Sequence, residues 1–189
     1  MLNKDNFSNY MLPILAMEGN GQLTDDPADA GGATIWGITQ TTARAAGYTG
    51  AMADMTLTVA LDIYHPTYWL DPGFDKIDAI LPTLGRYLLQ TGINLGSGIP
   101  GTFLQRSLNV LSNQGALYPV LTVDGVLGKR TRASLVTYLS IRTMAQDGDL
   151  VLMGAMRALT VLKYIEIAEA DPSQQQFLFG WLRNRALGL

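Results

Sequence analysis

Two carboxyl groups stand where acid–base chemistry is expected. Glu18 closes an apolar helical pattern and opens a glycine-rich segment. Such a position buries a carboxyl against apolar side chains and raises its pKa, as a general acid requires. Asp29 follows eleven residues later on a loop that continues into two glycines. Glycosidases use such a pair, one carboxyl to protonate the leaving oxygen and the other to activate water or stabilise the cation.

Both residues also have a structural interpretation. Glu18 at the end of a helix can simply face water, and Asp29 beside proline and glycine can form an Asx turn. The cluster of Asp25, Asp26 and Asp29 also suggests a calcium loop. It lacks the alternating Asp spacing and the Glu at the twelfth position that such a loop needs. We therefore expect no metal site and no cofactor.

The composition restricts which other chemistry is available. The 189 residues include no Cys, which excludes disulfides, thiolate metal sites and a Cys nucleophile. The single His, His65, cannot form a two-His zinc site within one chain. It lies on an apolar helical stretch beside Pro66, which favours packing over catalysis. Of the 16 acids only three are Glu, namely Glu18, Glu166 and Glu169, so few groups remain for acid–base catalysis.

Charge is distributed unevenly along the chain. Residues 1–80 carry ten acids and three bases, whereas residues 81–189 carry six acids and ten bases. Two explanations of this asymmetry are equally good. It can reflect surface solubility alone, or the basic half can face an anionic polymer. The pI of about 5.0 argues against nucleic-acid binding. Because the sequence has no apolar run of about 20 residues and no signal peptide pattern, we expect cytoplasmic synthesis and no stable membrane insertion.

Helical patterns provide most of the elements that position these residues. Phe7, Met11, Ile14 and Leu15 share one helical face in the segment before Glu18, and Pro13 should bend that helix or remove one backbone bond. Residues 19–38 are irregular, with short strand pairing expected around Gln22–Thr24 and Thr34–Gly37. Further helices are expected from the cap Thr39 to the stop Gly47, over 56–69 with a break at Pro66, and over 81–93, 101–114, 128–146, 149–170 and 172–187.

The glycine-rich segment carries a specific resemblance. Glu-Gly-Asn at 18–20 and Asp-Pro-Ala-Asp-Ala-Gly-Gly-Ala-Thr-Ile-Trp-Gly-Ile-Thr at 26–39 resemble the signature of glycoside hydrolase family 108. Its members are N-acetylmuramidases found mainly as phage endolysins. Val-Asp-Gly-Val-Leu-Gly-Lys-Arg-Thr at 123–131 resembles the family's C-terminal predicted peptidoglycan domain. The chain departs from the pattern in lacking the Tyr after the Glu-Gly pair and in a longer loop before Pro27.

The resemblance implies a mainly α, lysozyme-like, two-lobed fold with a short irregular or β-hairpin segment after the first helix. Residues 1–92 would form the catalytic lobe and residues 93–189 a helical C-terminal lobe. The implied reaction is hydrolysis of the bond between N-acetylmuramic acid and N-acetylglucosamine in peptidoglycan. The implied protein is a monomer that depends on a holin to reach the periplasm or the cell wall.

The resemblance also assigns individual residues. Glu18 matches the catalytic Glu, and Asp29 and Thr34 match residues that hold water in related phage-type lysozymes. Expected substrate-binding residues are Trp36, Asn94 and Gln105.

Two other functions stay open, namely a non-catalytic wall-binding or virion structural protein and a secreted muramidase toxin. Two C-terminal segments have both a functional and a structural interpretation. Residues 124–128 resemble a wall-binding signature but also make a tight turn and a helix start, which we favour. Residues 177–189 resemble a membrane-active amphipathic tail, although core packing is the expected role.

Overall fold

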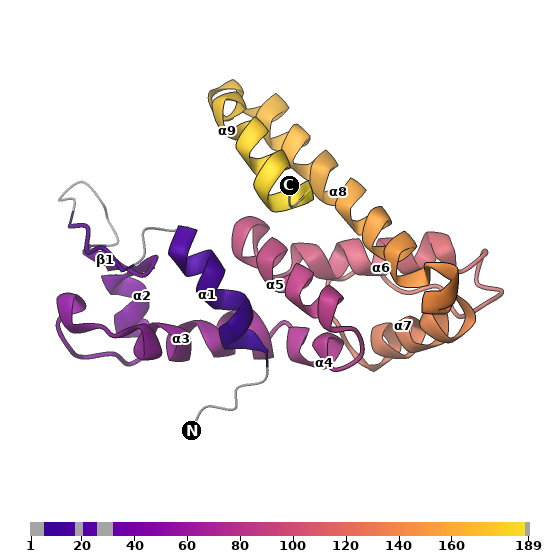
Figure 1. Cartoon of the computed structure of the whole chain (residues 1–189), viewed down its shortest axis with the longest axis horizontal. Coiled ribbons are helices and arrows are strands. Elements are labelled where there is room, and N and C mark those ends of the chain that lie inside the picture. The colour runs from indigo at the N-terminus through magenta and orange to yellow at the C-terminus, as the bar shows by residue number, and fades with distance from the viewer. Residues whose placement is uncertain (1–5, 18–20, 26–31, 188–189) are drawn as a thin grey trace. The chain divides into compact units, whose positions relative to one another are not determined.

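The computed structural model describes residues 6–17, 21–25 and 32–187, and the chain divides into two compact units, Met1–Asp71 and Pro72–Leu189 (Figure 1). The described residues are mainly α-helical, with a small antiparallel pair of strands after the first helix. This confirms the expected fold class. The expected division between residues 92 and 93 falls inside a continuous helix, α5 (Pro82–Leu95). The structural division lies earlier because the apolar side of α5 packs within the second unit.

The first unit contains three helices, two short strands, one 3₁₀ turn and one π-helical turn among its described residues. They are α1 (Phe7–Met17), β1 (Thr34–Ile35), β2 (Ile38–Thr39), α2 (Gln40–Ala45), the 3₁₀ turn η1 (Met52–Asp54), α3 (Leu57–His65) and the π-helical turn η2 (Pro66–Leu70).

Helix α1 buries the face that its apolar spacing predicts. Phe7, Met11, Ile14 and Leu15 are all buried, as residues at helical spacing on one face must be. Pro13 is exposed. The backbone bond that its missing N–H removes therefore lies on the solvent side, where water replaces it. This is why a helix with an internal proline still leads up to Glu18, which lies outside the described residues.

Pro66 ends α3, as expected, and changes the helical register of the following turn. Proline has no N–H to donate to the carbonyl one turn earlier. The chain continues as the wider turn η2, in which the N–H of Asp71 donates to the carbonyl of Pro66 at 2.9 Å. This turn places the Trp69 ring, which is fully buried, against the rings of Phe7 and Tyr10 with centroids 5.9 and 6.0 Å apart. Trp69 is thus part of the core of this unit.

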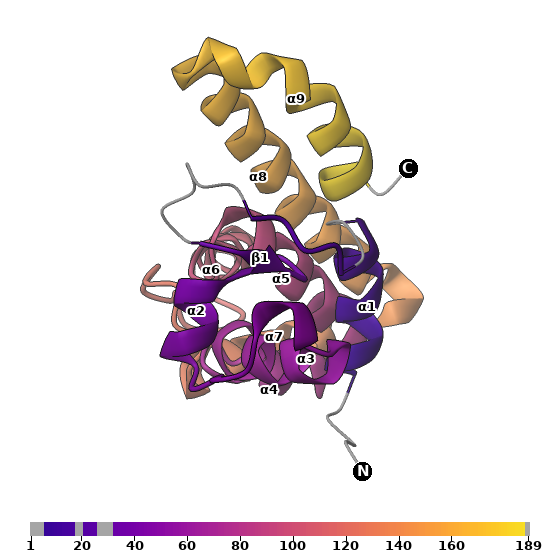
Figure 2. The ribbon, with the colours of Figure 1, turned by 90° about the vertical axis from the view of Figure 1, so that its left-hand side faces the viewer.

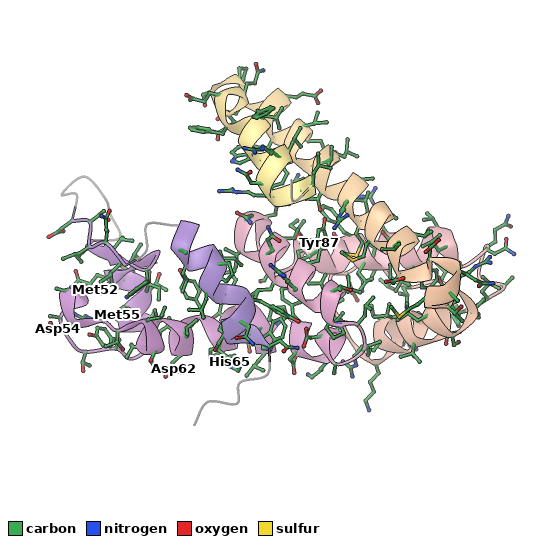
Figure 3. The ribbon with its side chains drawn as sticks, viewed as in Figure 1. Met52, Asp54, Met55, Asp62, His65 and Tyr87 are labelled. Atoms are coloured by element: carbon green, nitrogen blue, oxygen red, sulfur yellow. The ribbon has the colours of Figure 1, made fainter. Side chains whose placement is uncertain are left out.

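A second apolar cluster supports the strands. Met52 and Met55, labelled in Figure 3, are buried with residues of both strands, α2 and α3. The members of this cluster are Ile35, Ile38, Ala43, Met52, Met55 and Ala60. Because the two strands alone are too short to be stable, this cluster supplies the packing that holds them in place.

The second unit is helical throughout its described secondary structure. Its elements are α4 (Phe74–Asp78), α5 (Pro82–Leu95), α6 (Ile99–Leu111), α7 (Lys129–Ile141), the 3₁₀ turn η3 (Met144–Gln146), α8 (Gly148–Ala170), the 3₁₀ turn η4 (Pro172–Gln174), α9 (Gln175–Gly180) and the π-helical turn η5 (Trp181–Leu187).

Leucines of α5 and α6 form the centre of this unit, where Leu84, Leu88, Leu104 and Leu108 are fully buried. Helix α5 packs on α4 and α6, and α6 packs on α8. A buried polar pair crosses the core, with the hydroxyls of Tyr87 and Thr160 2.7 Å apart.

The C-terminal segment runs beside α8, and both views show α9 and α8 side by side (Figures 1 and 2). The Trp181 ring lies 5.5 Å from that of Tyr164, and Ala186 is buried, so the segment packs within the unit as expected. Phe177 and Phe179 nevertheless remain 50% and 79% exposed. No helix among the described residues is long and apolar enough to cross a bilayer.

Candidate functional site

Thr34 is fixed by backbone bonds on both sides. It exchanges two backbone hydrogen bonds with Thr24, at 2.9 and 2.7 Å, and pairs with Thr39 across the hairpin Thr34–Thr39. The pairing expected between residues near Thr24 and Thr34 is therefore present. The Thr34 hydroxyl donates to the Gly32 carbonyl over 3.4 Å. Because this hydrogen bond is long and weak, the Thr34 hydroxyl can exchange it for a bond to a water or a ligand.

The hairpin turns through Trp36 and Gly37, which the sequence analysis had placed in a strand. Both have positive φ, 55° and 74°, as a type I′ turn requires. A Trp in this conformation is uncommon and is stabilised by its surroundings. Its indole N–H donates to the Met55 carbonyl at 2.9 Å, and its own carbonyl accepts from the Tyr64 hydroxyl at 3.0 Å.

The Trp36 ring also packs against Gly21. Gly21 lies directly against the ring, and a Cβ at that position would overlap the ring atoms. Gly21 has a φ of +79°, which favours glycine on backbone grounds as well. Trp36 is half-buried and its one polar atom is already bonded. The described contacts thus give Trp36 a structural role, and its contact with sugar stays a prediction.

Glu18 and Asp29 both lie outside the described residues. The described residues closest to them in sequence are Met17, at the end of α1, and Gly32, two residues before β1. Of the six predicted site residues, the structure brings Thr34 and Trp36 together on the hairpin.

Asn94 and Gln105 belong to the second unit. Asn94 is half-buried in the last turn of α5, where its Nδ2 donates to the carbonyl of Gln90 at 2.7 Å. This bond stays within the helix and leaves the Asn94 side-chain carbonyl oxygen as the atom available to a sugar.

Gln105 uses its whole amide within the chain. Its Nε2 donates to Asp124 Oδ1 at 2.7 Å and to the Val126 carbonyl at 3.0 Å. Its Oε1 accepts from the backbone N–H groups of Asp124 and Gly125, at 3.0 and 2.8 Å. Two donors and two acceptor sites are the full capacity of a glutamine amide. Gln105 is 1% exposed and its amide anchors the loop, so its contact with a substrate stays a prediction.

The loop that Gln105 holds forms the turn expected at residues 124–128. Asp124 Oδ1 also accepts from the Val126 N–H at 2.8 Å, which makes an Asx turn. The Gln105 bond, followed by the Val126 bond, lowers the pKa of Asp124. Gly125 has a φ of +77°, and Gly101 of α6 lies so close to its carbonyl that no Cβ fits. This loop leads directly into α7.

Sequence reasoning missed an aromatic hollow beside the hairpin. A cavity of about 350 Å³ is lined by Gly37 and Thr42 on one side and by Tyr64 and Tyr68 of α3 and η2 on the other. The two Tyr rings lie 5.6 Å apart. Their spacing of four residues, which puts both rings on one helical face, was the signal available in the sequence.

His65 does not join this hollow. Its ring packs edge-on against Phe7 with centroids 5.0 Å apart, which agrees with the packing role expected for it. In residues 6–17, 21–25 and 32–187, no group of three or more His, Cys, Asp or Glu side chains is arranged to hold a metal ion.

Comparison with known proteins identifies the class of this chain. Residues 11–96 match the family Glycosyl hydrolase 108, and residues 99–186 match the Predicted Peptidoglycan domain family. The protein is thus a glycoside hydrolase with a lysozyme-like fold and a peptidoglycan-related C-terminal domain. The match over residues 11–96 confirms the resemblance to glycosyl hydrolase family 108 that the signature around Glu18 indicated.

A solved structure and a search among curated proteins complete the comparison. The chain is similar to the structure of Brucella abortus SagA, with 26% identity, coverage of 97% of this chain and 99% of that chain, and a TM-score of 0.51. No match was found among curated proteins.

Proposed function

We propose that the protein is an N-acetylmuramidase that cleaves the bond between N-acetylmuramic acid and N-acetylglucosamine in peptidoglycan. The observation that carries this proposal is the family match over residues 11–96, a segment that contains Glu18, Asp29 and Thr34. The second family match, over residues 99–186, supports peptidoglycan as the polymer. The aromatic hollow beside the hairpin supports the proposal further, because its two Tyr rings offer apolar faces next to polar groups.

In the proposed reaction Glu18 donates its proton to the leaving glycosidic oxygen while positive charge develops on the sugar ring. Asp29 and Thr34 orient the water or stabilise the cation. The paired backbone of Thr34 supports this role. Because the backbone is already fixed, little conformational entropy is lost when the Thr34 Oγ orients a water.

The test compares Glu18→Gln with a matched Glu166→Gln variant. Gln keeps the shape of Glu but has no proton to give, so the Glu18 variant should digest purified cell wall about 10²-fold more slowly or worse. Glu166 is exposed on α8 and pairs with Lys163 at 3.5 Å, so its variant should keep full activity. Mass spectrometry of the digest should show muramic acid at the new reducing ends. Full digestion by a folded Glu18→Gln protein would sink the mechanism.

The second carboxylate is tested by Asp29→Asn against Asp25→Asn. Asp25 is exposed four residues earlier, so it controls for removal of one negative charge from the loop. The Asp29 variant should lose about 10²-fold in turnover and the Asp25 variant much less. The reverse order would mean that a different loop residue orients the water.

We further propose that the activity serves host lysis by a phage, as in the endolysins that the sequence resembles. A holin gene beside the coding sequence is the expected genomic context. An immunity gene there instead would identify a secreted toxin with the same chemistry.

A further inference from the structure

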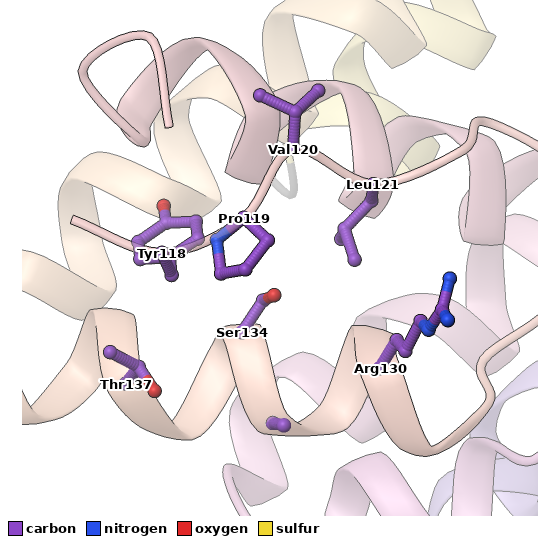
Figure 4. A pocket seen from close by; sticks show the side chains of 8 residues that line it. Tyr118, Pro119, Val120, Leu121, Arg130, Ser134 and Thr137 are labelled. Carbon is purple, nitrogen blue, oxygen red and sulfur yellow. The ribbon is translucent and has the colours of Figure 1, made fainter. Parts of the chain in front are cut away.

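A pocket of about 400 Å³ lies in the second unit and is lined by none of the residues assigned above. It opens between residues 118–121 and the face of α7 that carries Arg130, Ala133, Ser134 and Thr137 (Figure 4). We call it the α7 pocket. Its volume is in the lower part of the range of small-ligand sites, roughly 300–1,000 Å³, so it suits a short and compact group.

The loop wall of the α7 pocket is held in place without a ligand. Asn109 bonds the Leu121 backbone twice, accepting from its N–H at 2.7 Å and donating to its carbonyl at 2.8 Å. The Tyr118 hydroxyl donates to the Leu108 carbonyl at 2.9 Å, and the Tyr118 ring packs edge-on against Tyr138. A preformed wall loses little entropy when a ligand binds.

The lining is mostly alkyl, with few hydroxyls. Pro119 and Leu121 lie on the side of the loop that faces α7 (Figure 4), and Ala133 lines the pocket from α7. Val120 is 60% exposed, an aliphatic side chain left in water at the pocket. The hydroxyl of Ser134 points toward the loop wall (Figure 4). Since the Tyr118 hydroxyl is already bonded, the side-chain hydroxyls left for a ligand are those of Ser134 and Thr137, which is few for a sugar ring with hydroxyls around its edge.

Arg130 is the one charged group among the described lining residues. The first turn of α7 holds Lys129, Arg130 and Arg132 and no acid. Cations at a helix N-terminus oppose the helix dipole, which favours negative charge there. Three like charges at this end are therefore unfavourable in the free protein and become favourable when an anion binds.

We propose that the α7 pocket binds the carboxyl end of a short peptide with small alkyl side chains. Arg130 pairs with the carboxylate. Pro119, Leu121 and Ala133 surround the alkyl groups, and Ser134 bonds the peptide backbone. This chemistry is that of the alanine-rich stem peptides of peptidoglycan, so the choice of ligand rests on the proposed function. The glycan strand and the peptide would then be recognised by different parts of the chain.

The test uses ¹⁵N-labelled full-length protein and N-acetyl-D-alanyl-D-alanine at millimolar concentration. Saturable amide shifts are expected at Tyr118, Val120 and Leu121 and at residues 130–137. The C-terminal amide of the same dipeptide lacks the charge and should bind about tenfold more weakly or worse, as loss of a charge-assisted bond implies. Arg130→Ala should weaken binding by a similar factor. Lys129→Ala removes an equal charge from the neighbouring exposed residue and should retain binding.

A second pair of variants tests the volume of the α7 pocket. Ala133 is exposed, so Ala133→Leu fills the pocket without disturbing the core and should abolish the shifts. Ala158→Leu places the same side chain at an exposed position on α8 and should leave them intact. The proposal is overturned if the dipeptide causes no amide shifts or causes them elsewhere. It is also overturned if the amide form binds as tightly as the acid, or if Arg130→Ala and Lys129→Ala have equal effects. Wall digestion by the parent separates this result from the proposed function, because cleavage without dipeptide binding refutes only the pocket.

Discussion

Replacement of Gln105 by Leu should destabilise the second unit even though the side chains have similar volumes. The variant removes two bonds from backbone N–H groups, at Asp124 and Gly125, and two donated bonds, to the Val126 carbonyl and to Asp124 Oδ1. At about 1 kcal/mol for each bond, the loss is about 4 kcal/mol. The apolar side chain placed at a site with 1% exposure recovers part of this. We therefore expect a net loss of about 2 kcal/mol in the free energy of unfolding.

Urea denaturation followed by circular dichroism measures this loss, which corresponds to a midpoint lower by roughly 1 M. Hydrogen exchange at the Asp124 and Gly125 amides gives a local measure, since both amides should exchange faster in the variant. Arg106→Leu changes the exposed neighbour on α6 and should shift the free energy by no more than about 0.5 kcal/mol. An unchanged midpoint together with protected amides at Asp124 and Gly125 would refute the anchoring role of Gln105.

Three further changes test other contacts. Gly21→Ala should displace the Trp36 ring and cost about 1–2 kcal/mol because of its positive φ and the overlap; tryptophan emission and the thermal midpoint report it. Thr160→Val leaves the buried Tyr87 hydroxyl without its 2.7 Å partner and should lower the unfolding free energy by about 1–3 kcal/mol, measured by urea denaturation. Burial raises the pKa of Tyr118 to about 12 from 10.0, so the folded state favours the neutral phenol. The free energy of unfolding should keep the whole Tyr118 contribution below pH 10 and fall between pH 10 and about 12. The fall should be smaller in Tyr118→Phe.

Helices with long apolar patterns were the most predictable elements. The face of α1 and the Thr39 cap, which accepts from the Thr42 N–H at 3.2 Å, follow directly from the sequence. Helix α4 was missed because five residues are too few for a periodic pattern. The helix expected over 128–146 ends at Ile141, because Gly148 packs against the backbone of Arg142 and the chain must turn there.

The roles of polar side chains were harder to predict than the helices. A resemblance places Gln105 in a family position but does not show whether its amide faces a ligand or its own chain. The groups it bonds begin 19 residues later, at Asp124, so no local pattern reveals the pairing. The same holds for Trp36, which is expected to bind sugar. Its indole N–H bonds the Met55 carbonyl 19 residues later, and no local pattern indicates that bond.

The two ways of dividing the chain disagree, and this limits how such proteins can be recombined. The hydrolase family segment reaches residue 96, whereas the first compact unit ends at Asp71. Helices α4 and α5 therefore lie within the hydrolase family segment. Their side chains Phe74, Leu84 and Leu88 are nevertheless buried in the second compact unit. A gene fusion that joins a foreign C-terminal domain at residue 96 would leave those side chains without their packing partners. A chimera that keeps these contacts has its junction near residue 72 or takes both segments from the same parent.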